Sequence, residues 1–157
     1  MTLERTPSQT VGPFFEIGLC VRGESEPVAA DAPDAVRIEG RVLDGDGAPV
    51  PDAMVEIWPD WGRCGSDSDG RYSFVTRIPE ARAGQAPHLS VLVFARGLLK
   101  PVLTRMYFPG EPANEHDPVL LGIADDERAT LIAVGQKDSL RFDVRLQGEG
   151  QTAFFSL

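Results

Sequence analysis

A repeated alternation of apolar and polar side chains constrains the fold of this chain more than any other feature. In the segment 36–43, Val36, Ile38 and Val42 fall on one side of an extended backbone, and charged residues fall on the other. A period of two residues is the signature of a half-buried β-strand. The chain has 16 Gly and 13 Pro among its 157 residues, and such frequent interruptions favour short strands over long helices.

The same reasoning predicts a series of short strands. A turn rich in Gly and Asp at 44–47 follows the first strand, so we expect the segment 54–58 to return beside it. The segment 88–96 is apolar on both faces, which predicts a central strand covered on both sides. The predicted strands are 36–43, 54–58, 71–77, 88–96, 101–108, 141–147 and 152–155.

Only the segment 125–134 has a helical pattern, with acidic residues at its start and apolar residues after them. The predicted fold class is therefore all-β: a β-sandwich of short, mainly antiparallel strands with one short helix. This domain covers residues 36–157. Residues 1–35 lack periodicity and contain several prolines and acids, which predicts an extended N-terminal arm that packs on a partner subunit.

Charge and hydropathy narrow the function classes. The net charge of -9 argues against nucleic acid and against an anionic membrane surface, because both favour a basic protein face. The N-terminus lacks the features of a signal peptide, and no apolar run approaches the length of a membrane span. We therefore expect a cytoplasmic protein in which Cys20 and Cys64 stay reduced and pack as small side chains.

The sequence offers little material for a catalytic or metal site of its own. It has no Gly-x-Ser-x-Gly elbow and no phosphate-binding glycine loop. His88 lies in a predicted strand, but Ser90 occupies the next position on the same side. Tyr72 and Tyr107 fit strand patterns as packing residues, and His116 fits a solvated loop. We assign no catalytic residue and no metal ligand to this chain.

Arg96 has two interpretations that the residues alone leave open. It ends an apolar strand and precedes Gly97, which lets the backbone turn sharply. An Arg at the rim of a strand can be a surface residue whose stem packs on apolar neighbours. Its planar guanidinium is also well suited to a carboxylate, including that of an aromatic acid.

Five segments, in order along nearly the whole chain, resemble the intradiol ring-cleavage dioxygenase family. Within it, they resemble the alpha-type subunits of the members that cleave protocatechuate. In that family the second segment forms a β-hairpin and the fourth contains the central strands. The segments are TPSQTVGPFFEIGL (6–19), IEGRVLDGDGAPVPDAMVEIWPD (38–60), SDSDGRYSFVT (66–76), APHLSVLVFARGLLKPVLTRMYFPGE (86–111) and RFDVRLQGEGQTAFFSL (141–157).

The resemblance also bears on iron. In catalytic members of the family, two tyrosinates and two histidines bind a mononuclear Fe(III), and the histidines come from a His-x-His strand. His88 matches one of them, but Ser90 replaces the other, and the segments 58–66 and 78–85 contain no tyrosine. The segment 58–66 is also much shorter than in typical relatives. The resemblance therefore implies an iron-free alpha subunit whose catalytic beta subunit holds the Fe(III).

Alpha subunits of this family contribute a wall of the substrate pocket at the interface with the beta subunit. Matched position by position, the wall residues are Thr10, Gly12, Pro13 and Arg96. The implied substrates are O2 and a small aromatic catechol acid. The implied reaction is intradiol cleavage of protocatechuate to 3-carboxy-cis,cis-muconate within a higher-order hetero-oligomer.

Two alternatives remain at this point. The first is a free-standing binding module, because the segment 42–58 also resembles transthyretin-like β-sandwiches. The arm TPSQTVGP at 6–13 argues against it, since a solitary module has no use for such an arm. The second is an iron enzyme that acts alone, with His88, His116 and Tyr72 among its ligands.

Overall fold

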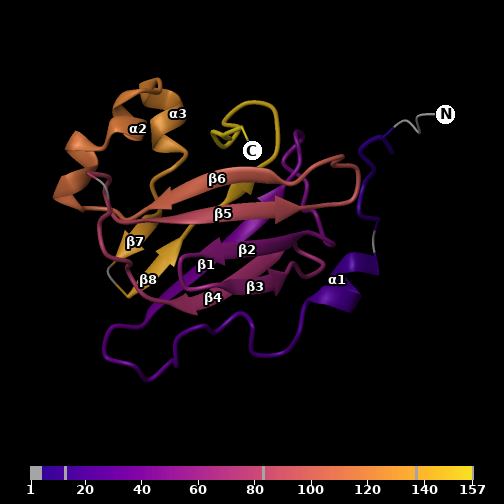
Figure 1. Cartoon of the computed structure of the whole chain (residues 1–157), viewed down its shortest axis with the longest axis horizontal. Helices are drawn as coiled ribbons and strands as arrows, with labels where there is room; N and C mark the ends of the chain where they lie inside the picture. The colour runs from indigo at the N-terminus through magenta and orange to yellow at the C-terminus, as the bar shows by residue number, and fades with distance from the viewer. Residues whose placement is uncertain (1–4, 13, 83, 137, 157) are drawn as a thin grey trace.

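The computed structural model describes residues 5–12, 14–82, 84–136 and 138–156, so Pro13 lies outside the described residues. The strands are β1 (Val36–Leu43), β2 (Met54–Trp58), β3 (Gly62–Gly65), β4 (Arg71–Thr76), β5 (His88–Phe94), β6 (Val102–Tyr107), β7 (Val134–Gln136), β8 (Ser139–Arg141) and β9 (Val144–Arg145). They form two sheets that pack face to face (Figure 1). One sheet has the order β4-β1-β8-β7, with β9 also paired to β1, and the other has the order β3-β2-β5-β6. The predicted all-β sandwich is confirmed.

The core lies between the sheets, where alternate residues of the strands meet. In β1, the predicted inward residues Val36, Ile38 and Val42 are buried. In β5, Leu89 and Val91 are buried in the same way, while the residues between them are half-buried. Burying such a side chain stabilises the fold by about 1.5–3 kcal/mol. The predicted coverage of this central strand is therefore complete on one face and partial on the other.

The predicted hairpin between the first two strands is wrong. β1 pairs with β4, β8 and β9, whereas β2 pairs with β3 and β5 in the other sheet. The turn at 44–47 does form, and Val50 donates its amide to the carbonyl of Val42 at 2.9 Å. The chain then crosses to the second sheet. Alternation reports which face of a strand is buried, but packing of the whole sandwich decides which strand lies beside it.

The helix predicted at 125–134 is shorter than expected, since α3 is Asp125–Ala129. Beyond it, Tyr107 donates its amide to the carbonyl of Leu131, and Ala133 donates its amide to the carbonyl of Tyr107. These two bonds hold the backbone in an extended path beside β6. Three further helical segments were not predicted: α1 (Phe14–Leu19), the 3-10 segment η1 (Pro112–His116) and α2 (Pro118–Leu121). No helix within the described residues is long and apolar enough to cross a membrane.

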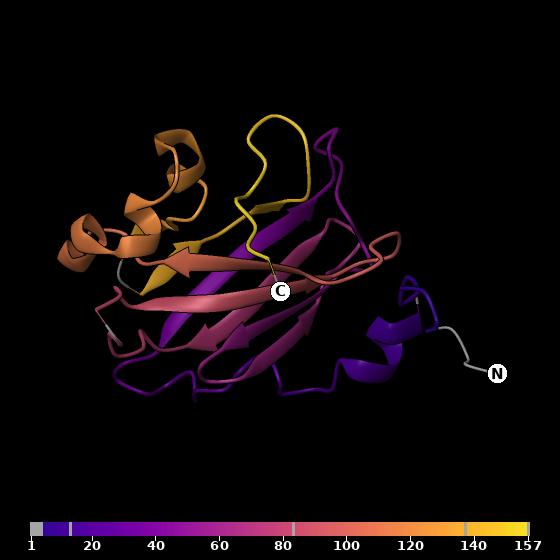
Figure 2. The ribbon, with the colours of Figure 1, turned by 45° about the horizontal axis from the view of Figure 1, so that its top comes forward.

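Part of the N-terminal arm lies on the sandwich itself. Val75 in β4 donates its amide to the carbonyl of Ser25 at 2.9 Å, and Val28 donates its amide back to Val75 at 3.3 Å. Val28 is buried by this contact. Figure 2 shows the arm running along the lower side of the sandwich before it enters β1. Packing of the arm on a partner subunit remains a prediction.

Candidate functional site

The turn after β5 presents Arg96 at an exposed corner. Leu98 donates its amide to the carbonyl of Ala95 at 3.1 Å, which closes a four-residue turn. Gly97 has a φ of 92°, in the left-handed region that the third residue of a type II turn requires. Arg96 takes the second position, and its side chain is 61% exposed. We call this the Arg96 turn.

Asp52 lies beside Arg96 because of the strand register. Met54 of β2 pairs with Phe94 of β5, and two residues further on the same antiparallel register places Asp52 opposite Arg96. Oδ2 of Asp52 is 3.0 Å from Nε of Arg96. The Asp52 side chain is only 14% exposed, so a largely buried carboxylate supports a guanidinium that stays in solvent.

The N-terminal arm meets the same turn. Gly97 donates its amide to Oγ1 of Thr10 at 2.9 Å. Gly12 has a φ of 75°, a conformation that favours glycine and bends the arm just after this contact. The structure thus brings Thr10 and the Arg96 turn together, with Gly12 two residues along the arm. The fourth predicted wall residue, Pro13, lies outside the described residues.

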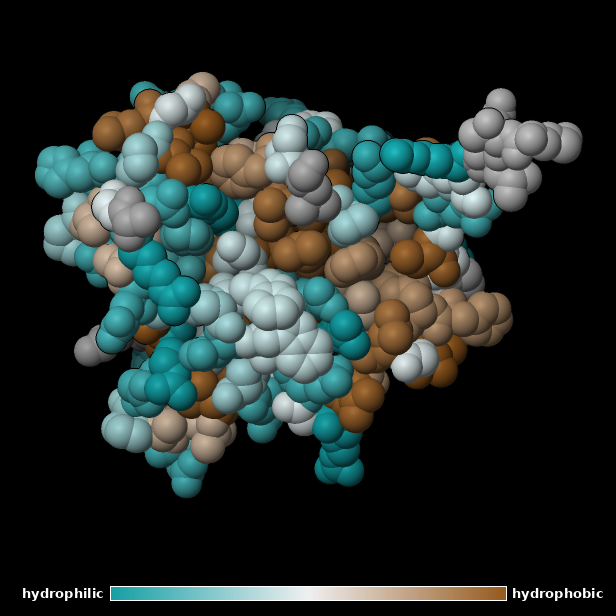
Figure 3. Space-filling model, in the orientation of Figure 1, coloured by the Kyte–Doolittle hydropathy of each residue, from teal (hydrophilic) through white to brown (hydrophobic). Residues whose placement is uncertain are grey.

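Exposed apolar side chains gather around α1 and the neighbouring arm. Phe14 and Ile17 are 78% and 77% exposed, and Figure 3 shows apolar surface concentrated at this end of the molecule. A group of large exposed apolar side chains marks a protein interaction surface. We call this group the apolar surface; its members are Val11, Phe14, Ile17, Leu19 and Val21.

Arg63 in β3 fixes α1 against the sandwich. Its guanidinium donates to the carbonyl of Leu19 at 2.9 Å and to Oε1 of Glu56 at 2.6 and 2.8 Å. Glu56 is only 9% exposed, so the ion pair is shielded from solvent and removal of one partner leaves a buried charge. Within α1, the side chain of Phe15 is buried. The helix is therefore anchored by its inner side while the apolar surface faces outward.

His88, which the resemblance aligns with a metal ligand, has the environment of a structural histidine. Its Nδ1 lies 2.8 Å from the carbonyl oxygen of Ala86, and its ring packs 5.2 Å from that of Tyr107. Burial lowers the pKa of His88, which favours the neutral ring. The Tyr107 hydroxyl donates to Oδ1 of Asp117 and accepts from Nη1 of Arg105, each at 3.2 Å. A cavity of about 150 Å³ lies beside His88.

These residues do not fit a ferric site. Tyr72 lies in the core, where its hydroxyl donates to the carbonyl of Phe142, so it is not placed to join His88. Burial raises the pKa of both Tyr72 and Tyr107, which opposes the ionised form of a tyrosinate ligand. His116 is exposed on η1. Within the described part of the chain, no group of three or more His, Cys, Asp or Glu side chains is placed to hold a metal ion.

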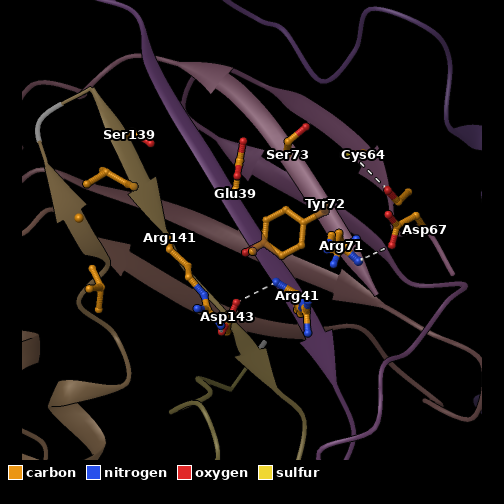
Figure 4. A pocket seen from close by; sticks show the side chains of 15 residues that line it. Glu39, Arg41, Cys64, Asp67, Arg71, Tyr72, Ser73, Ser139, Arg141 and Asp143 are labelled. Atoms are coloured by element: carbon orange, nitrogen blue, oxygen red, sulfur yellow. Dashed lines mark hydrogen bonds and ion pairs between the residues drawn. The ribbon is translucent and has the colours of Figure 1, made fainter. Parts of the chain in front are cut away.

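A broad hollow of about 970 Å³ lies over β1, β4 and β8 (Figure 4). Its charges offset one another: Arg71 pairs with Asp69 at 2.7 Å, and Arg141 pairs with Asp143 at 2.5 Å. Among the described wall residues, Thr10, Gly12 and Arg96 do not line this hollow. The charged residues that do are Glu39, Arg41, Asp67, Arg71, Arg141 and Asp143.

Comparison with known proteins decides the family. No family model matches the chain. The chain is 37% identical over 196 positions to the protocatechuate 3,4-dioxygenase alpha chain of Burkholderia cepacia, and the match covers 99% of both chains. It is 34% identical over 194 positions to the alpha chain of Pseudomonas putida, covering 98% of this chain and 96% of that one.

This chain belongs to the protocatechuate 3,4-dioxygenase alpha-chain family, within the intradiol dioxygenases. The resemblance of the five segments is thereby confirmed. The Burkholderia match spans 196 positions although this chain has 157 residues, so part of the relative has no counterpart here. This alpha-chain homologue is a compact one.

The fold extends to more distant dioxygenases. The dioxygenase domain of a dioxygenase and carbohydrate-binding protein fusion from Streptomyces sp. SirexAA-E superposes with a TM-score of 0.67 at 21% identity. The match covers 92% of this chain and 99% of that chain. At that identity the similarity shows a common fold.

Nothing in the sequence points to Asp52. The resemblance predicts Thr10, Gly12 and Arg96 as wall residues, and this remains a prediction. Asp52 stands two residues before one predicted strand, and Arg96 closes another. Only the pairing of those two strands brings the carboxylate to the guanidinium.

Proposed function

We propose that this chain is the iron-free alpha subunit of a protocatechuate 3,4-dioxygenase. It completes the substrate pocket of a beta subunit that holds Fe(III), and the assembled enzyme cleaves protocatechuate with O2 to 3-carboxy-cis,cis-muconate. The observation that carries the proposal is the contact of Thr10 with the Arg96 turn, which builds a one-sided wall. Arg96 is exposed, so a second surface is needed to enclose a ligand there.

Arg96 supplies the recognition chemistry that a carboxylated catechol requires. Asp52 contacts Nε of Arg96, and the two Nη groups remain for a bidentate contact with a carboxylate. The chain has a net charge of -9, so its overall field repels an anionic substrate, and a fixed cation at the wall provides local attraction. In this proposal Arg96 binds and orients the substrate, and ring cleavage takes place on the partner.

The apolar surface supports a partner subunit at this end of the molecule. Burying Phe14 and Ile17 against a second chain contributes about 1.5–3 kcal/mol for each side chain. The arm joins the apolar surface to the Arg96 turn through Thr10. A beta subunit that covers the apolar surface therefore also reaches the wall residues, and coverage of the remaining exposed arm favours a higher-order hetero-oligomer.

Iron in this proposal belongs to the beta subunit, where it supplies the chemistry that activates the catechol toward O2. The support in this chain is the donor set around His88. Ser90 stands where the family's second histidine is expected, and both tyrosines are held by burial in the neutral form. A free-standing binding module leaves the contact of the arm with the Arg96 turn unexplained.

The proposal is tested by purifying this chain alone and together with a beta chain from the same genome. We expect a colourless chain without iron when it is alone. The complex should contain iron, absorb in the visible region and consume O2 with protocatechuate. Iron and colour in the isolated chain, or a beta chain that is equally active without it, would refute the proposal.

Arg96→Ala in the complex tests the wall directly. Loss of a charge-assisted contact of about 1.5–3 kcal/mol predicts a rise in KM for protocatechuate of roughly 10- to 100-fold, with unchanged iron content. Arg77→Ala is the matched control, because Arg77 is also a half-exposed Arg whose Nε lies 3.0 Å from an Asp carboxylate. Equal kinetics in the two variants would remove Arg96 from the site.

A further inference from the structure

We propose that Asp52 is the positioning residue for Arg96, and so a determinant of specificity for carboxylated catechols. This inference rests on the proposed function of the Arg96 turn. Asp52 lies in the turn that leads into β2 and is far less exposed than Arg96, since their side chains are 14% and 61% exposed. It acts on the substrate through the guanidinium and makes no contact with the substrate itself.

The position of Asp52 is built into the sheet. It lies in the turn that enters β2, and the pairing of Met54 with Phe94 sets it opposite Arg96. The next residue, Ala53, is fully buried and donates its amide to Oγ of Ser66 at 2.9 Å. The backbone that carries Asp52 is therefore fixed, while the long side chain of Arg96 has many rotamers in solvent.

The geometry divides the guanidinium into two parts. Oδ2 of Asp52 is 3.0 Å from Nε, so the carboxylate lies beside the inner edge of the guanidinium. The outer Nη groups can then meet a substrate carboxylate end-on without displacing Asp52. Arg96 thereby bridges one carboxylate of the protein and one of the substrate.

The contact between Asp52 and Arg96 lacks a well-aligned hydrogen bond in the structure of this chain. Oδ2 of Asp52 is buried and accepts no well-aligned hydrogen bond from any described residue, although Nε of Arg96 is within 3.0 Å. A buried carboxylate oxygen without a hydrogen bond is unfavourable. A guanidinium turned so that Nε–H points at Oδ2 would satisfy this oxygen and leave the Nη groups directed away from Asp52. Asp52 thus favours the substrate-bound orientation of Arg96.

The test uses the assembled complex and the variant Asp52→Asn, with Asp60→Asn as the matched control. Oδ2 of Asp60 lies 3.0 Å from Nε of Arg77, the same separation, but on a surface where both side chains are nearly half exposed. The substrates are protocatechuate and catechol, which lacks the carboxylate. Thermal unfolding and iron content of each complex show whether the variant is intact.

We expect Asp52→Asn to raise KM for protocatechuate by about three- to tenfold, with kcat and the KM for catechol unchanged. In an Arg96→Lys background the same substitution should have no further effect, because Lys has no Nε–H edge for Asp52 to hold. Asp60→Asn should leave KM unchanged for both substrates.

Each other outcome overturns the inference in a recognisable way. If Arg96→Ala raises KM but Asp52→Asn does not, Asp52 does not position Arg96 and the proposed function stands. A lower KM in Asp52→Asn would show that Asp52 competes with the substrate. Equal effects on both substrates, or an equal effect in the Arg96→Lys background, would show a merely structural role. If neither variant has an effect, the proposed wall itself is refuted.

Discussion

Asp117 offers the sharpest test of how this fold is held together. Its carboxylate is fully buried and binds four donors. Oδ1 accepts the amides of Val119 at 2.8 Å and Leu120 at 3.1 Å, and also the hydroxyl of Tyr107 at 3.2 Å. Oδ2 accepts the amide of Ala86 at 2.8 Å. One side chain thus caps α2 and joins it to the strand β6 and to the segment before β5.

The substitution Asp117→Ala removes all four bonds. Loss of a helix cap costs about 1 kcal/mol. The buried amide of Ala86 and the hydroxyl of Tyr107 then lack an acceptor, at about 1–3 kcal/mol each. We expect a total loss of about 3–7 kcal/mol in unfolding free energy, a large part of the roughly 5–15 kcal/mol that stabilises a typical domain. Asp117→Asn keeps the shape and one oxygen, so its cost should be smaller, at about 2 kcal/mol.

Urea unfolding followed by tryptophan fluorescence measures these losses at pH 7. Glu111→Ala is the control, because Glu111 also caps a short helix but accepts only one long bond, from Ala113 at 3.4 Å. We expect it to cost less than about 1 kcal/mol. If Asp117→Ala is no more damaging than Glu111→Ala, the reasoning from buried donors is wrong.

The contribution of Asp117 should also depend on pH. Burial acts to raise the pKa of Asp117, but the amides of Leu120, Ala86 and Val119 outweigh it and hold the pKa below its ordinary value of 3.8. The unfolded chain therefore takes up the proton more readily than the folded chain. The stabilisation is present above that ordinary value and is lost as the pH falls below it. The gap in unfolding free energy between the wild type and Asp117→Asn should narrow from pH 7 to pH 3.

Two further predictions concern the core. Gly40→Ala places a β-carbon 1.8 Å from the carbonyl oxygen of Phe142, so we expect it to lower the free energy of unfolding in urea by about 3 kcal/mol or more. The control is Gly18→Ala, which has nothing within 4 Å of its new β-carbon and should be neutral. Similar losses of unfolding free energy in the two variants would contradict this. Tyr72→Phe removes the buried hydroxyl that donates to Phe142 and should cost about 1–2 kcal/mol by the same assay, so an unchanged midpoint would show that this bond adds nothing.

Local patterns were sufficient to find most strands. The segment 36–43 has the bounds of β1, and its buried and exposed residues alternate as the sequence predicts. This succeeded because alternation depends only on the two faces of a single strand. β3 is not among the predicted strands, because its four residues, GRCG, contain no apolar alternation. It is a strand because β2 supplies its hydrogen bonds.

Patterns failed where distant segments decide the structure. The apolar residues after Ala129 suit a helix, but the backbone of Leu131 and Ala133 bonds instead to Tyr107 of β6. The return of β2 beside β1 was wrong for the same kind of reason. Nothing within 36–58 indicates that β1 finds its partners in β4, β8 and β9.

The residues of the candidate site also differ in whether the sequence indicates them. The resemblance predicts Thr10 and Arg96 as wall residues, and the structure shows the arm in contact with the Arg96 turn through Gly97. The residue chemistry of Arg96 alone left a surface role equally open. Asp52 was missed because its relation to Arg96 exists only through the register of β2 and β5.

The position of β1 has a consequence for synthesis of the chain. β1 lies early in the sequence, yet it pairs in parallel with β8 and β9. The amide of Arg41 also donates a hydrogen bond to Oδ1 of Asp143, 102 residues later. During synthesis on the ribosome, one edge of β1 therefore stays open until β8 and β9 have emerged. An open strand edge invites pairing with other nascent chains. Emergence of β8 and β9, more than any local step, should be the moment at which this sheet closes.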